Sequence, residues 1–104
     1  MKPTPELVLE ALRPVIDPEL GMSIVDLGLV RGIEVEEDTG RVRIRLTLTS
    51  PMCPLGPELL AATRMAAERL EGVREAQVEL VWSPPWDPRI DASEEARAEL
   101  GIWD

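Results

Sequence analysis

The sequence predicts an α+β fold, a two-layer domain in which helices cover one face of a small three-stranded sheet. Apolar and polar residues alternate in three segments, so each expected strand has a single apolar face. Segments with helical spacing stand before, between and after these strands, in the order α-β-β-α-β-α. Because each strand has only one apolar face, the helices must pack on the same side of the sheet. A length of 104 residues suits one domain, residues 1–104.

The first helix is predicted from Thr4 and Pro5. A threonine hydroxyl can accept a hydrogen bond from a first-turn amide, and proline lacks the N–H that would have no partner there. Apolar residues then follow at helical spacing: Leu7, Val8, Ala11, Leu12 and Val15. Pro14 should end or kink this helix, because its ring disfavours the α conformation at Arg13.

Two short segments follow the first helix. Residues 17–21, DPELG, are expected to form a turn or a single helical turn that carries two carboxylates. Residues 23–28, SIVDLG, are apolar and end in glycine, so they fit either a brief strand or one turn. Asp26 is interpreted as a residue that caps a turn.

A β-hairpin is predicted over residues 29–36 and 41–48, with residues 37–40 as its turn. In the first strand, Gly32 indicates a bulge or a close backbone approach. The apolar residues of this strand share one parity: Leu29, Ile33 and Val35. The second strand alternates cleanly, and its apolar face carries Val42, Ile44, Leu46 and Leu48.

The polar face of this hairpin carries Arg41, Arg43, Arg45 and Thr47. We expect Glu34 and Glu36 to lie across from Arg43 and Arg45, in cross-strand pairs worth about 0.2 to 1 kcal/mol each. The arginine row is therefore interpreted as a solvated sheet face.

The remaining elements follow from their start and stop signals. A second helix begins at Gly56-Pro57, with apolar residues at helical spacing up to Leu70 and a stop at Gly72. A third strand covers about residues 75–82, and the proline-rich residues 83–88 form a loop. The last helix is predicted over residues 92–100, with Asp91 and Glu94 as a capping box and Gly101 as its stop.

Composition excludes several classes of function. A formal net charge of −9 repels nucleic-acid phosphates, so no nucleic-acid partner is expected. No apolar stretch approaches the length that spans a bilayer, and the first residues lack a secretory signal, so we expect a cytoplasmic protein without a membrane partner. The many Glu and Arg residues and the ten prolines are compatible with a thermophilic source.

The absence of histidine narrows the chemistry further. It excludes a Cys-His nucleophilic pair, a histidine metal site and a histidine general base within one chain. The chain is therefore not expected to be an enzyme.

The single cysteine, Cys53, marks the most informative segment, TSPMCPLGP over residues 49–57. It stands between a predicted strand and a predicted helix, where the positive end of the helix dipole favours the thiolate, the form that binds metal and attacks electrophiles. Pro51 and Pro54 stiffen the backbone around it. A lone cysteine is, however, more often a small buried apolar group.

The other candidate residues also have structural interpretations. Asp17 before Pro18 is an ordinary N-cap followed by a first helical position, and a functional carboxylate is the alternative. The hydroxyls of Thr49 and Ser50 can satisfy backbone groups at a strand end. Trp82 and Trp86 are interpreted as cover for the core, because aromatic side chains bury a large area.

The motifs DPEL at 17–20, SIVDLGLV at 23–30 and LTSPMCP at 48–54, followed by LEGV, PPW and SEEA, occur in this order along the chain. In this combination the sequence resembles the metal-sulfur cluster biosynthesis family, which includes PaaD-like and SufT-like proteins. The resemblance covers nearly the whole chain. The sequence ends at Asp104 without the cysteine-rich tail of PaaD proper, which favours a generic single-domain relative.

The resemblance implies an iron-sulfur cluster assembly domain that acts in cluster maturation or delivery. It implies a functional site made of Asp17, Glu19, Leu20, Thr49, Ser50 and Cys53, in which Cys53 contacts metal. Ser50 stands where relatives often have a second threonine. The implied cargo is iron or a transient iron-sulfur cluster, and the implied partners are other assembly proteins and client apoproteins.

Three hypotheses follow. An iron-sulfur cluster usually takes four thiolates, so one cysteine predicts a transient carrier or adaptor whose cluster is shared across a homodimer, uses other ligands, or is completed by a partner or a small thiol. The second is an interaction module that docks through its acidic surface and residues 84–86 without touching iron. The third is a small cysteine-dependent enzyme, for which a carboxylate would be a poor base.

Overall fold

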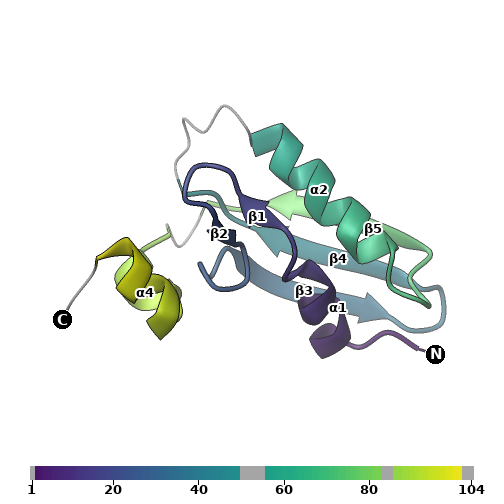
Figure 1. Cartoon of the computed structure of the whole chain (residues 1–104). Helices are drawn as coiled ribbons and strands as arrows, with labels where there is room; N and C mark the ends of the chain where they lie inside the picture. Colours follow the sequence, from purple (N-terminus) through teal and green to yellow (C-terminus); the bar gives the residue numbers. More distant parts are fainter. Residues whose placement is uncertain (1, 50–55, 83–85, 102–104) are drawn as a thin grey trace.

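The computed structural model describes residues 2–49, 56–82 and 86–101, and their arrangement confirms the predicted α+β class (Figure 1). Helices α1 and α2 lie on one face of a three-stranded sheet. Two additional short strands and one additional short helix interrupt the predicted order. The elements of the described residues are α1 (Pro5–Leu12), β1 (Ile16–Asp17), β2 (Met22–Ser23), β3 (Val30–Glu36), β4 (Arg41–Leu46), α2 (Gly56–Glu68), β5 (Glu75–Leu80), α3 (Pro88–Asp91) and α4 (Glu94–Leu100).

The sheet has the order β3-β4-β5, with β4 at its centre. Strand β4 pairs antiparallel with β3 and parallel with β5, so the chain crosses over through α2 between the two parallel strands. The apolar residues of β4 are buried, and each lies between two apolar partners. The sets of partners in register are Val35, Val42 and Ala76, then Ile33, Ile44 and Val78, then Val30, Leu46 and Leu80.

A register shift between Val30 and Gly32 confirms the predicted irregularity in β3. The extra residue changes which side chains face the core. Val30 therefore takes the position across from Leu46, and the single parity predicted for this strand is broken. Leu29 is also fully buried, but it precedes the strand, where its carbonyl accepts a hydrogen bond from the Thr47 amide at 2.8 Å.

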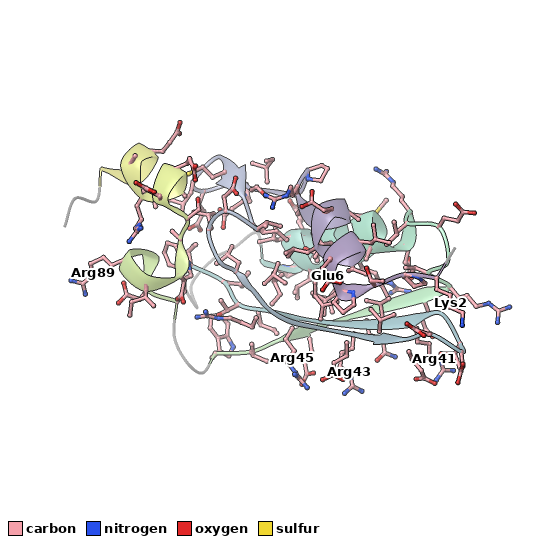
Figure 2. All side chains as sticks on the ribbon, turned by 90° about the horizontal axis from the view of Figure 1, so that it is seen from below. Lys2, Glu6, Arg41, Arg43, Arg45 and Arg89 are labelled. Atoms are coloured by element: carbon pink, nitrogen blue, oxygen red, sulfur yellow. The ribbon has the colours of Figure 1, made fainter. Side chains whose placement is uncertain are left out.

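The arginine row lies on the face of the sheet opposite α1 and α2 (Figure 2). Glu34 lies across from Arg43, as predicted, but its carboxylate forms a diagonal ion pair with Arg45 at 2.7 Å. Glu36 lies across from Arg41, which is neither of the two arginines expected to face the glutamates. The turn at residues 37–40 sets this register, because it closes the hairpin at Glu36 and Arg41. Arg41 instead contacts Glu75 of β5 at 3.6 Å.

The helix ends follow the capping signals, with one correction. The Leu7 amide donates to Thr4 Oγ1 at 3.2 Å, which confirms the first N-cap, and α1 ends before Pro14. Helix α4 is capped by Ser93, whose Oγ accepts from the Ala96 amide at 3.1 Å, and not by Asp91. Its C-cap, Gly101, is left-handed with φ 76°, as the stop signal predicts.

The core lies between the sheet and helices α1 and α2, and it extends under residues 24–29. Its buried apolar residues are Val8, Leu12, Val15, Ile24, Leu27, Leu29, Val42, Ile44, Leu46, Leu48, Leu59, Ala67, Ala76, Ala92 and Ala96. Trp86 packs against this core, but Trp82 is 44% exposed, so the core role predicted for both tryptophans holds only for Trp86. Within the described residues, the structure contains no helix both long and apolar enough for a membrane span.

Candidate functional site

The motif at residues 17–20 forms the tip of a small hairpin. Strands β1 and β2 pair antiparallel, with Asp17 across from Met22. The Asp17 side chain is 1% exposed, and its Oδ1 accepts hydrogen bonds from the amides of Glu19 at 2.8 Å and Leu20 at 3.2 Å. The Asp17 carbonyl accepts from the Gly21 amide at 2.7 Å. Asp17 therefore organises the turn, as the capping interpretation expects.

Two distant motifs meet at the hairpin tip. The Thr49 hydroxyl donates to Glu19 Oε2 at 3.3 Å, a contact between residues 30 positions apart. Glu19 is exposed, Thr49 is half-buried, and Leu20 packs against the core. The structure thus brings together four of the predicted site residues: Asp17, Glu19, Leu20 and Thr49.

The two remaining site residues, Ser50 and Cys53, lie outside the described residues, so their place in the site stays a prediction. The described residues on either side of them do come together. Gly56, the first residue of α2, is buried, and a Cβ atom there would lie 3.0 Å from Leu48 Cδ1. The segment with the cysteine therefore joins the end of a strand region to the start of a helix, as the sequence predicts.

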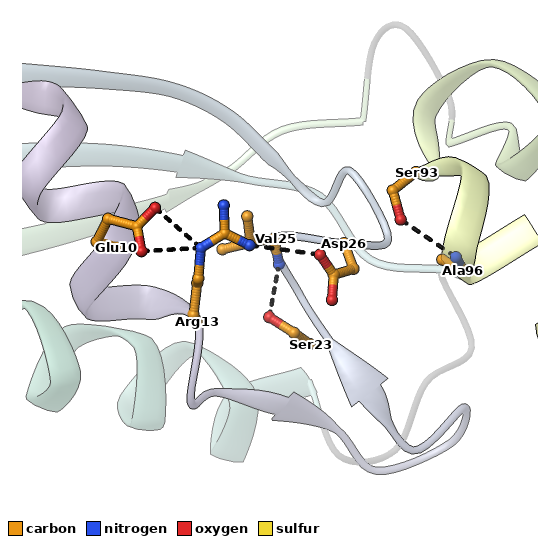
Figure 3. Close-up of polar contacts among 7 residues, drawn as sticks. All are labelled: Glu10, Arg13, Ser23, Val25, Asp26, Ser93 and Ala96. Carbon is orange, nitrogen blue, oxygen red and sulfur yellow. Dashed lines mark hydrogen bonds and ion pairs between the residues drawn. The ribbon is translucent and has the colours of Figure 1, made fainter.

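The sequence motifs did not predict the role of the turn over residues 23–28, which connects three parts of the molecule. The first two contacts are drawn in Figure 3. Ser23 Oγ accepts from the Val25 amide at 3.2 Å, so serine, not Asp26, caps the turn. The Asp26 carboxylate faces Arg13 after α1, with 3.5 Å between Oδ1 and Nη1. Arg13 also binds Glu10 at 3.0 Å, and this hydrogen bond is the main cause that raises the pKa of the Arg13 guanidinium.

The same turn holds the C-terminal segment, residues 86–101. The Trp86 indole N–H donates to the Leu27 carbonyl at 2.6 Å, and the Ser93 amide donates to the Asp26 carbonyl at 2.7 Å. Gly28, with φ 75°, lies directly against Asp91: a Cβ atom at Gly28 would come within 2.1 Å of the Asp91 carbonyl oxygen. A glycine after the SIVDL residues was the available signal for such a close approach.

One mostly buried ion pair reinforces this attachment. Arg31 Nη1 lies 3.0 Å from Asp91 Oδ1, with both side chains less than one-fifth exposed. The hydrogen bond from Arg31 holds the pKa of the Asp91 carboxyl below its usual value, although burial opposes this shift. Within the residues that the structure describes, no group of three or more Cys, Asp or Glu side chains is arranged to hold a metal ion.

Comparison with known proteins identifies the family. The sequence pattern of the family described as "Iron-sulfur cluster assembly protein" matches residues 5–80. The chain is 43% identical to the Fe-S protein maturation auxiliary factor YitW of Bacillus subtilis, over 93% of each protein. It is 40% identical to the Fe-S protein maturation auxiliary factor SufT of Staphylococcus aureus, over 85% of this chain and 98% of that protein.

A solved structure shows the same fold. A conserved hypothetical protein of Thermotoga maritima superimposes with a TM-score of 0.83 at 42% identity, covering 97% of each chain. The protein belongs to the iron-sulfur cluster assembly family, and the resemblance seen in the sequence motifs is confirmed.

Proposed function

We propose that this member of the iron-sulfur cluster assembly family serves the maturation of iron-sulfur proteins as a transient carrier or adaptor, without catalysing a reaction itself. In this proposal iron or a cluster is cargo, the Cys53 thiolate contacts it, and Glu19 orients the contact. The proposal is supported mainly by one observation, the hydrogen bond between Thr49 and Glu19 at 3.3 Å. It joins the acidic turn, residues 17–20, to Thr49, from which the chain continues to Cys53.

The acidic turn is preorganised. Asp17 is buried and binds two amides of the turn, so the backbone under Glu19 is fixed before any ligand arrives. A preset turn loses less conformational entropy on binding. The Glu19 carboxylate remains exposed above it, where it can contact metal or a partner's cation.

The single cysteine favours a transient contact with an iron-sulfur cluster over stable binding of the cluster. An iron-sulfur cluster is usually held by four cysteines, and this chain has one. A client protein, another assembly protein, a small thiol or a second copy of the chain must therefore complete the ligand set. The last case predicts a homodimer that shares one cluster.

One observation supports the alternative hypothesis, in which the protein is a docking module that does not touch iron. Trp82 after β5 is 44% exposed and Ile90 on α3 is 78% exposed, so the C-terminal part of the molecule presents apolar side chains to solvent. Trp86, in contrast, is an internal anchor through its bond to Leu27. If a partner docks near here, Trp82 and Ile90 are the side chains that would contact it.

Anaerobic reconstitution with iron and sulfide tests the carrier proposal. We would compare the wild type with Cys53→Ser, Glu19→Gln and Thr49→Val, recording visible absorption, the mass of the assembly and transfer to an apo-ferredoxin. The matched control is Glu6→Gln, because Glu6 is another exposed glutamate, in the first turn of α1. We expect Cys53→Ser to abolish transfer, Glu19→Gln and Thr49→Val to slow it, and Glu6→Gln to leave it unchanged.

Two results would contradict the carrier proposal. A cluster signal of equal strength in wild type and Cys53→Ser would remove Cys53 from the ligands. Intact client maturation by Cys53→Ala would favour the docking module instead. The measured mass separately decides whether a cluster is shared between two copies.

A further inference from the structure

Among the described residues, no strand pairs with the outer edge of β5. Strand β5 is the last strand in the order β3-β4-β5. The amide of Val81 donates to Leu46 of β4 at 2.9 Å, and that of Glu75 donates to Gly40 just before β4 at 3.4 Å. Because amides in a strand alternate in direction, those of the even-numbered residues of β5 point away from β4. These residues are Ala76, Val78 and Leu80.

One end of this edge is blocked, whereas the other end has no partner in the part of the chain that the structure describes. The outward amide of Ala76 donates to Glu68 Oε2 at 3.2 Å, and Glu68 is itself held by Arg64 at 3.4 Å. No described residue outside the strand accepts a hydrogen bond from the amides of Val78 and Leu80. An edge strand with free amides is a template for pairing with another extended segment.

Hollows on both faces of this edge leave room for the side chains of an added strand. The hollow beside α2 measures about 440 Å³ and is lined by Leu60, Ala61, Arg64, Glu75, Ala76, Gln77 and Val78. The hollow on the opposite face measures about 490 Å³ and is lined by Arg43, Gln77, Val78 and Glu79. The side toward α2 offers apolar contacts from Leu60 and Ala61 beside the charged Arg64, and the other side carries Arg43 and Glu79.

The charges on the exposed sheet face form stripes along the strands. The β3 stripe is acidic, the β4 stripe is basic and the β5 stripe is acidic: Glu34 and Glu36, then Arg41, Arg43 and Arg45, then Glu75 and Glu79. Arg41 contacts Glu75, whereas Glu79 has no ion-pair partner among the described residues. A next strand beside β5 would continue the alternation if it placed basic residues on this face, because opposite charges directly across a strand pair are favourable.

Two other arrangements are disfavoured. A second copy that paired its β5 antiparallel with this one would set acidic stripe against acidic stripe, and like charges across a strand pair are destabilising. The other edge of the sheet, β3, contains the irregularity at Gly32, and a bulge of this kind blunts an edge. The net charge of −9 also favours a basic partner.

We propose that the β5 edge binds an extended segment of a partner protein that carries Arg or Lys at alternate positions, with apolar residues between them. The backbone of the segment pairs with Val78 and Leu80, its basic side chains lie beside Glu79, and its apolar side chains pack on Leu60 and Ala61. The proposal uses no residue of the turn at 17–20 and does not involve Cys53, so it does not depend on the proposed function.

A peptide titration tests this interface. The probe is the blocked hexapeptide RVRIRL, which has the required alternation, and the controls are EVEIEL and an RVRIRL peptide with alternate backbone amides methylated. We expect RVRIRL to bind the wild type and to slow hydrogen exchange at the Val78 and Leu80 amides. Its affinity for the Glu79→Lys variant should be about five- to tenfold weaker. Glu36→Lys, an exposed charge reversal on the opposite edge of the same face, should bind like the wild type.

Several outcomes would overturn the proposal. One is that RVRIRL does not bind at concentrations up to about 1 mM. Another is that the methylated peptide binds as tightly as RVRIRL. A third is that Glu79→Lys and Glu36→Lys weaken the binding of RVRIRL equally. Protection of the Val78 and Leu80 amides in a dimer without any peptide would show that a second copy occupies the edge. Circular dichroism of both variants establishes that each keeps its fold.

Discussion

The acidic hairpin, residues 16–23, and the C-terminal segment, residues 86–101, adjoin the same turn but are held in different ways. The tip of the hairpin is held by hydrogen bonds between residues two to four positions apart, all centred on Asp17. The C-terminal segment is held by contacts such as Trp86 to Leu27, 59 positions apart, and Arg31 to Asp91, 60 positions apart. The turn at the hairpin tip is thus locally organised, whereas the C-terminal segment depends on the finished fold.

The largest effect should come from Gly28→Ala. The substitution places a Cβ atom 2.1 Å from the Asp91 carbonyl and forces alanine into a left-handed conformation. The Asp91 backbone cannot shift without disturbing its own contacts. We therefore expect a loss of about 3 kcal/mol in the free energy of unfolding, or release of residues 86–101. Urea unfolding and limited proteolysis measure the two outcomes.

The matched control for this change is Gly21→Ala in the hairpin. Gly21 is also left-handed, with φ 68°, but nothing lies within 4 Å of the added Cβ. Only the backbone cost remains, about 1 kcal/mol. If both variants lose equal stability, the close approach of Gly28 to Asp91 does not constrain the fold.

The next effect should come from Asp17→Ala, which removes the acceptor for two amides in a buried position. We expect a loss of about 2 kcal/mol in the free energy of unfolding, measured by urea denaturation. Asp17→Asn keeps an oxygen acceptor and should recover most of this stability. If Asp17→Asn is stable yet fails in cluster transfer, the carboxylate charge acts in function as well as in the turn.

A smaller effect is expected for Trp86→Phe. Phenylalanine keeps most of the packing but cannot donate a hydrogen bond to the Leu27 carbonyl. We therefore expect a loss of about 1 kcal/mol in the free energy of unfolding. Faster proteolysis within residues 86–101, with unchanged exchange at the Glu19 and Leu20 amides, would show that the two regions are independent. Faster exchange at those two amides would contradict that independence.

The smallest effect should be the contribution of Asp91 to the pH dependence of the free energy of unfolding. Its carboxyl pKa is lower in the folded state than in the unfolded chain, mainly because Arg31 donates a hydrogen bond to it. Asp91 therefore stabilises the fold above about pH 4, and this contribution is lost as the pH falls through the lowered pKa. Urea midpoints measured between pH 3 and pH 6 should vary less in Asp91→Asn than in the wild type. Equal pH profiles would show that the ion pair does not contribute.

Local signals predicted the elements well, and the errors occurred where distant contacts compete with them. The Thr4 cap, the Gly101 stop and the Gly32 irregularity each depend on neighbouring residues only, and all three are confirmed. The capping box at Asp91 was a reasonable local prediction. It was wrong because Arg31 binds the Asp91 carboxylate, which leaves Ser93 to cap α4.

The candidate site shows the same division. That the motifs at Asp17 and Thr49 belong to one site came from a family resemblance, not from any periodicity. The structure places Glu19 and Thr49 together, while Ser50 and Cys53 stay predictions. The role of residues 23–28 as an anchor for the C-terminal segment had no local signal beyond the glycine at 28.

The amino-acid sequence alone predicts the α+β class, the apolar and polar faces of β4, and a chain with one cysteine and no histidine. Those properties depend on composition and on repeats of two or 3.6 residues, which act over a few neighbours. Tertiary packing sets the order β3-β4-β5, the contact of Glu19 with Thr49 and the pairing of Arg31 with Asp91. Each of these joins residues far apart in the chain, and their meeting depends on how the whole chain packs around its core.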